Sequence, residues 1–132
     1  MYKKTLKVFG EYLAQSQSLP LNASADGNGV ELPVDKTMGA LEVVVEVDAQ
    51  VGLADTKVLS VKLQHKDVGG AYADLATIYA KTAAGATTLA AGSVLARYTL
   101  PSDCKALIKA VITTTDAAAT GKLNVFPSYL AR

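Results

Sequence analysis

The chain has 132 residues, half of them hydrophobic, which is enough for one ordinary domain with a packed core and too short for two. A formal net charge of +1 excludes the overall positive field that would gather nucleic acid or an anionic membrane surface. A single cysteine excludes an internal disulfide, and no apolar run is long enough to cross a bilayer. We therefore expect one soluble domain held by packing, with no nucleic-acid or membrane partner.

The surface is predicted to be poor in charge, because only 19% of the residues are charged against roughly a quarter in typical soluble domains. Two explanations stay open at this stage. Part of the surface is covered by neighbouring subunits, or the surface is simply neutral and rich in alanine. No uninterrupted apolar segment follows the basic first seven residues, so we expect no secretion signal and synthesis in the cytoplasm.

Residues 1–14 form a distinct opening in which lysines alternate with aromatic side chains. We interpret this segment as an N-terminal arm or a first strand, and residues 15–132 as the main domain. As an arm it would dock on another surface; the alternative is a slightly basic strand or a frayed terminus. The residues expected to make that contact are Tyr2, Lys3, Lys4, Phe9 and Tyr12.

Residues 22–29 are predicted to be a loop, because Gly27 and Gly29 stand beside Asp26 and Asn28, all of which tolerate positive φ. The aspartate and the asparagine share the spacing of a calcium-ligand pair. No acidic residue follows to close such a loop, so we expect no metal site here.

The clearest strands are residues 41–48 and 58–66, in which apolar and polar side chains alternate with a period of two. In the first, leucine and valine at odd positions are expected to face the core, with Val44 among the acidic residues of the wet face. If the two strands paired with each other in antiparallel fashion, Glu42 would lie opposite Lys62.

Further strands are predicted over residues 94–100, 106–115 and 123–130, with a mixed run over residues 72–81. Pro127 cannot donate to a ladder, so the last strand is expected to be an edge or a bulged strand. Its apolar side chains lie on both faces, which at an edge would need a cover. We expect a second copy to provide it, through Phe126, Tyr129 and Leu130.

Six to eight short strands with no amphipathic helix predict an all-β fold, a single-domain antiparallel β-sandwich or jelly roll. The residues for catalysis are few. The chain has one histidine, His65, and one cysteine, Cys104, and neither belongs to a known catalytic or metal-binding motif. We expect no enzymatic activity, no catalytic residues, no metal and no cofactor.

Five short stretches follow one another in a characteristic order: residues 43–48, 59–64, 90–92, 100–101 and 121–123. This order resembles the small cement, or decoration, proteins on the capsids of tailed bacteriophages, over most of the chain from Leu19 onward. The resemblance implies a β-sandwich or jelly-roll subunit, assembled as a homodimer or homotrimer. It would bind the major capsid protein on the outer surface of the virion, bridge neighbouring capsid subunits and stabilise the shell against the pressure of packaged DNA.

Two other functions remain open on the sequence. One is a different structural component of the virion, such as a head–tail joining or tail subunit. The other is a free β-sandwich that binds a carbohydrate or another ligand, although only 6% of the residues are aromatic and none is tryptophan.

Overall fold

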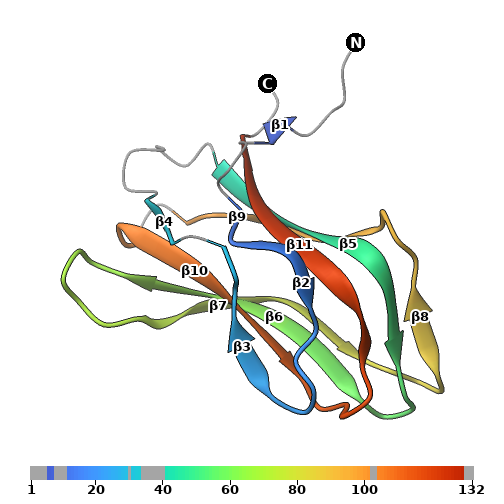
Figure 1. The fold of residues 1–132 in the computed structure, drawn as a ribbon. Helices are drawn as coiled ribbons and strands as arrows, with labels where there is room; N and C mark the ends of the chain where they lie inside the picture. The colour runs from blue at the N-terminus through green and yellow to red at the C-terminus, as the bar shows by residue number, and fades with distance from the viewer. Residues whose placement is uncertain (1–5, 8–11, 30, 34–40, 102–103, 130–132) are drawn as a thin grey trace.

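The computed structural model describes residues 6–7, 12–29, 31–33, 41–101 and 104–129. Over these residues the chain forms eleven strands and no helix, arranged as two antiparallel sheets (Figure 1). The sheets bury their apolar faces against each other. The prediction of an all-β sandwich is confirmed.

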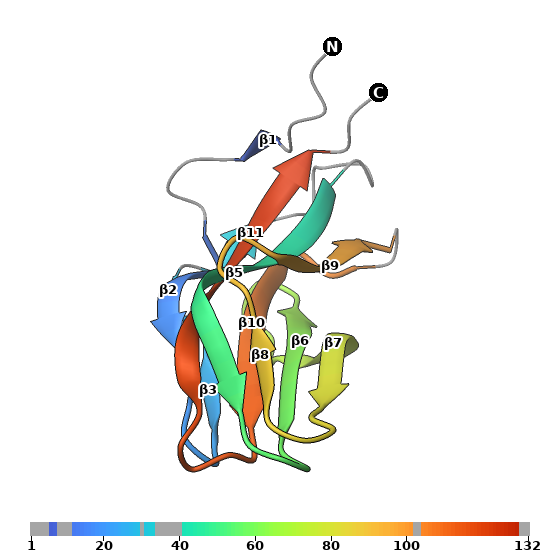
Figure 2. The ribbon, with the colours of Figure 1, turned by 90° about the vertical axis from the view of Figure 1, so that its right-hand side faces the viewer.

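Sheet A has six strands. Its inner pair is β5 (Leu41–Leu53) and β11 (Thr120–Tyr129), which run antiparallel along most of their length. On the free side of β11 lie β1 (Leu6–Lys7) and β2 (Ala14–Ser18), and on the free side of β5 lie β8 (Thr87–Leu89) and β9 (Val94–Thr99). The C-terminal part of β11 and the start of β5 extend beyond sheet B, with β1 alongside (Figure 2).

Sheet B has five strands. Its inner pair is β10 (Leu107–Thr114) and β6 (Val58–Lys66), and β7 (Ala73–Thr82) forms one edge. The other edge is shared by β3 (Ser24–Asp26) and β4 (Leu32–Pro33), both of which pair with β10.

The core follows the alternation in the sequence. The odd-numbered apolar residues of β5 from Leu41 to Val47 and those of β6 from Leu59 to Leu63 are buried between the sheets. Val44 departs from the prediction: it was expected on the wet face and is only 1% exposed. It lies on the outer face of sheet A between its neighbours Phe126 on β11 and Arg97 on β9, which shield it from water.

The first two long strands do not pair with each other. β5 and β6 follow each other in the chain but belong to different sheets, so Glu42 and Lys62 do not meet. Glu42 instead binds Arg97 of β9 at 2.6 Å, and Lys62 binds Asp74 of β7 at 3.1 Å. The reason is that the short connection after β5 crosses from sheet A to sheet B, so each strand takes partners from distant parts of the chain.

The last strand was predicted to be an edge or a bulged strand, and the structure shows the second alternative, with the bulges away from Pro127. β11 is an inner strand, with register shifts between Thr120 and Leu123. Pro127 is tolerated because of where its nitrogen points. The carbonyl of Val125 accepts the N–H of Leu13, so the backbone polar groups of Val125 point away from β5. Residues two apart in a strand point their backbone polar groups to the same side, so the Pro127 nitrogen lies between the part of β11 that pairs with β2 and the part that pairs with β1.

The segment predicted as a loop over residues 22–29 contains β3, and its glycines serve a different purpose from the one expected. Neither Gly27 nor Gly29 has a positive φ. A Cβ added to Gly27 would lie 2.0 Å from the carbonyl oxygen of Leu13, and one added to Gly29 would lie 1.8 Å from that of Tyr12. These glycines allow the chain to cross its own backbone where it passes from sheet A to sheet B.

The start of the main domain lies further toward the N-terminus than residue 15. Leu13 and Ala14 belong to the hydrophobic core, and the division expected between residues 14 and 15 falls inside β2. Residues 6–7 add a further short strand to the same sheet.

Candidate functional site

Of the five residues expected to contact another surface, the structure describes the side chain of one. The half-buried ring of Tyr12 packs on Phe126 of its own chain, with 5.6 Å between ring centres and 55° between ring planes. Tyr2, Lys3, Lys4 and Phe9 lie outside the described residues.

Of the three residues expected to mediate self-association, the structure likewise describes the side chain of only one, Phe126. Phe126 is 1% exposed, because its ring lies beneath Tyr12 on the outer face of sheet A. It therefore offers no side-chain surface to a second copy. The backbone of Tyr129 pairs with Leu41 and Leu6, and nothing further of Tyr129 is described. Leu130 lies outside the described residues.

A polar cluster lies on the outer face of sheet A, where β2, β5 and β11 meet. The hydroxyl of Ser16 donates to Asp48 at 2.7 Å, and the backbone N–H of Ser16 donates to the side-chain oxygen of Asn124 at 2.7 Å. The Asn124 amide group donates in turn to Asp48 at 3.4 Å. Because these groups bind one another, the cluster fixes the bent β2 strand to the sheet, and Ser16 adopts a φ of 44° there.

A charged network covers the outer face of sheet B around the ring of Tyr72. The ammonium groups of Lys66 and Lys109 lie 4.8 and 4.5 Å from the ring centre, and the Tyr72 hydroxyl donates to Glu31. Lys66 also binds Glu31 at 3.7 Å, and Lys109 binds Asp26 at 3.0 Å. Burial, followed by the Glu31 carboxylate, raises the pKa of Tyr72 to about 12. Each lysine of this network has an acidic partner.

The single histidine and the single cysteine of the chain both form hydrogen bonds with the backbone of Lys105. His65 Nδ1 accepts the backbone N–H of Lys105 at 3.2 Å, and the Cys104 thiol donates to the Lys105 carbonyl at 3.5 Å. Cys104 also packs against the core. In the part of the chain that the structure describes, no three histidine, cysteine, aspartate or glutamate side chains are grouped to hold a metal ion. The same residues include no helix that could span a membrane.

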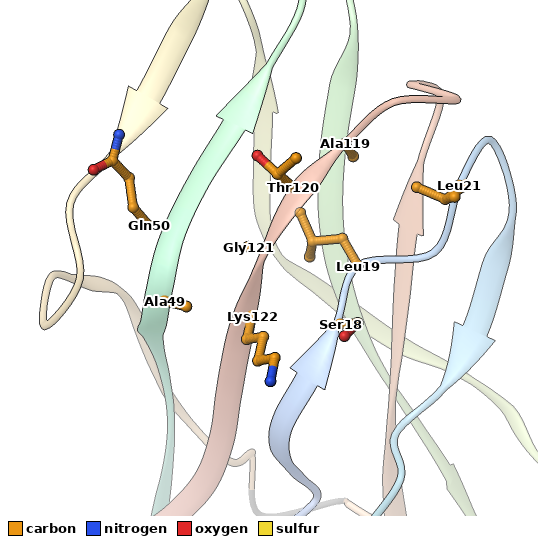
Figure 3. A pocket seen from close by; sticks show the side chains of 9 residues that line it. All are labelled: Ser18, Leu19, Leu21, Ala49, Gln50, Ala119, Thr120, Gly121 and Lys122. Carbon is orange, nitrogen blue, oxygen red and sulfur yellow. The ribbon is translucent and has the colours of Figure 1, made fainter.

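A hollow of about 450 Å³ opens at the end of the sandwich where β11 begins (Figure 3). Three of the residues that line it have small side chains or none: Ala49, Ala119 and Gly121, the last with a φ of +111°. Leu19 is buried in its floor and Leu21 is exposed at its rim. The remaining lining residues are polar: Ser18, Gln50, Thr120 and Lys122.

No protein-family model, curated protein or solved structure matches the chain.

This hollow was not predicted from the sequence. Its lining comes from three segments that are far apart in the chain, and it depends on the bulges of β11 next to Gly121. The small residues around position 120 were the available signal, but small residues of this kind are equally typical of turns. A bulge is set by long-range pairing, so the sequence pattern alone did not predict it.

Proposed function

We propose that the protein is a non-enzymatic structural subunit of a phage particle, which binds the outer face of the capsid, bridges neighbouring capsid subunits and stabilises the shell. Its partners are the major capsid protein and further copies of itself. The observation that carries the proposal is the position of the stretches that resemble decoration proteins. Residues 43–48 form part of β5 and residues 59–64 part of β6, which are inner strands of the two facing sheets.

The resemblance therefore concerns the framework of the sandwich and not a peripheral loop. Residues 121–123 extend it to β11, the strand that pairs with β5 along the centre of sheet A. Four of the resembling stretches contribute to the same packed core, with Val45, Leu63, Leu100 and Leu123 among the buried residues.

Stabilisation of a shell follows from mass action. A protein that binds the assembled shell and not its separated subunits stabilises each site by about 2.7 kcal/mol when its free concentration is a hundred times the Kd. A copy that bridges two capsid subunits stabilises the shell further, because the two subunits cannot separate until at least one of them dissociates from the bound copy. No reaction and no cofactor is required.

The N-terminal residues are the proposed contact with the shell. Tyr2, Lys3 and Lys4 precede β1, which pairs with β11 at the end of the sandwich that extends beyond sheet B (Figure 2). Aromatic and basic side chains suit such a contact, since tyrosine buries a large area at low entropic cost and lysine supplies charge for the rim.

The test is to add the purified protein back to capsids that lack it and to measure the temperature at which the shells rupture. We expect the rupture temperature to rise with protein concentration and then to saturate. Identical rupture temperatures with and without the protein would overturn the proposal.

The contribution of the arm is tested with a chain that lacks residues 2–5. The deletion stops before Leu13 and Ala14, because these residues belong to the core. We expect unchanged folding and at least tenfold weaker shell binding. The matched pair K4A and K81A compares an arm lysine with an exposed lysine of β7. Equal binding of all these variants and the unaltered chain would remove the arm from the contact.

The copy number per particle separates this function from its rivals. A decoration protein binds throughout the capsid lattice, whereas a head–tail joining or tail subunit occurs in a few copies or rings. A free carbohydrate-binding protein would be absent from purified particles and would bind glycans in solution.

A further inference from the structure

The turn that connects β6 to β7 carries an apolar side chain into solvent. Val68 is 80% exposed, more than Leu21 or Val94, the other exposed large hydrophobic residues of the described chain. The turn is closed by a hydrogen bond from the N–H of Gly70 to the carbonyl of Asp67 at 2.9 Å. A Cβ added to Gly69, whose φ is +79°, would have no atom within 4 Å, so the tip stands clear of the molecule.

The hollow beside Gly121 is large enough to take such a side chain. Its volume of about 450 Å³ lies within the range of roughly 300–1,000 Å³ that is typical of ligand-binding clefts. The side chains of Leu19, Leu21, Ala49 and Ala119 make much of its lining apolar. It can accept a valine side chain together with the glycine backbone that follows it, since Gly69 and Gly70 add no side chains of their own.

The charges beside the two features are opposite. Asp67 precedes Val68 in the turn, and Lys122 lies at the rim of the hollow (Figure 3). Among the described residues, neither Asp67 nor Lys122 has an ion-pair partner. If Val68 of one molecule entered the hollow of another, Asp67 of the first molecule would lie close to Lys122 of the second at the rim of the hollow.

One molecule cannot make this contact with itself, because the two features lie at opposite ends of β6. The turn follows Lys66, the last residue of the strand. The hollow lies near the other end: its residue Thr120 pairs with Gly52, and Val58, the first residue of β6, accepts the N–H of Thr115 at 3.0 Å. Figure 1 shows the turn and the start of β11 at these separate ends.

We propose that the protein associates head to tail, with the Val68 turn of one copy inserted into the Gly121 hollow of a second copy and Asp67 facing Lys122 across the rim. The contact joins two different surfaces, so it produces a ring where the rotation closes and a filament where it does not. The inference rests on the geometry of the chain alone and goes beyond the proposed role on a capsid.

The test is directed disulfide formation between two separate preparations, both carrying C104S so that the native thiol does not interfere. One preparation carries V68C in the turn and the other carries A49C in the hollow. Under mild oxidation, we expect the mixture to form a mixed disulfide dimer at least tenfold faster than either preparation forms a dimer alone. A mixture of V94C with A49C is the control, because Val94 is another exposed valine.

Two results would overturn the proposal. One is cross-linking of V68C with A49C no faster than that of the V94C control. The other is a predominant V68C–V68C dimer, which would indicate a symmetric contact between two turns. These measurements use the protein in solution without capsids, so their failure leaves the proposed shell-stabilising function to its own test.

Charge exchange provides a second measurement. Adding D67K to the V68C preparation should slow formation of the mixed dimer about two- to fivefold, which corresponds to an exposed ion pair. Adding K122E to the A49C preparation should then restore the rate, because the pair is re-formed with reversed charges. K81E in place of K122E should not restore it. Equal rates throughout would contradict the facing of Asp67 and Lys122.

Discussion

The carboxylate of Asp116, between β10 and β11, accepts the backbone N–H of Ala54, between β5 and β6, at 2.9 Å. Its second oxygen accepts the N–H of Ala118 at 2.8 Å. The carbonyl of Asp116 accepts the N–H of Asn22 at 3.1 Å, which adds a third segment of the chain. Asp116 thus joins three segments of the chain, through its side chain and its backbone carbonyl, at the end of the sandwich that holds the hollow.

Replacing this carboxylate should alter the stability of the protein in acid. The N–H groups of Ala54 and then Ala118 hold the pKa of Asp116 below its usual range, because they bind the charged form. The folded state therefore gains stability from Asp116 above the pKa of the unfolded chain and loses it as the pH falls through the lower, folded pKa.

We expect D116N to lower stability at neutral pH, since an amide offers one acceptor oxygen where the carboxylate offers two. The loss relative to the unaltered chain should shrink as the pH falls. Thermal unfolding measured across the acid range checks both points. The prediction is contradicted if the difference between the two proteins is constant with pH.

Substitution of the crossing glycines should be strongly destabilising. In G27A the new Cβ would lie 2.0 Å from the Leu13 carbonyl oxygen, which is backbone and cannot rotate away. We expect the free energy of unfolding to fall by at least ~2 kcal/mol, as for other substitutions that overpack a core. G69A is the control: it has open space and pays only for its positive φ, about 1 kcal/mol. Denaturant unfolding of the two variants should rank them in this order.

The phenol of Tyr72 should ionise at about pH 12. A raised pKa means that the folded state favours the protonated phenol. This contribution to stability is complete below pH ~10, the usual tyrosine pKa, and is lost as the pH rises toward 12. Difference absorbance of the phenolate, with Y72F to assign the signal, measures the titration. We expect E31Q to lower the pKa, because Glu31 contributes a hydrogen bond and a negative charge. An unchanged titration in E31Q would show that burial acts alone.

Phe126 should matter for folding and not for association. Truncation of a buried phenylalanine costs about 3–5 kcal/mol, and we expect F126A to fall in this range in denaturant unfolding. V94A, at an exposed apolar site, should change stability by less than ~0.5 kcal/mol. A double-mutant cycle with Y12A should give a coupling of about 0.5–1.5 kcal/mol for the ring pair. Zero coupling would mean that Tyr12 does not cover Phe126 in solution.

The sequence by itself determined the two long strands β5 and β6 and the side of each that faces the core. The odd-numbered residues of β5 and β6 alternate with polar ones, and this period of two is a property of the extended backbone that needs no knowledge of the partner.

Only the tertiary structure decided which strands are neighbours. Glu42 meets Arg97, 55 positions away, and not Lys62, because pairing depends on which sheet each connection leads to. The same long-range pairing made β11 an inner strand, enclosed Phe126 under Tyr12 and brought the hollow together around Gly121. Alternation is local, so it can be predicted from neighbouring residues. The choice of strand partners, the burial of side chains on the outer face of a sheet and the formation of cavities depend on contacts between distant segments. These contacts exist only in the folded chain.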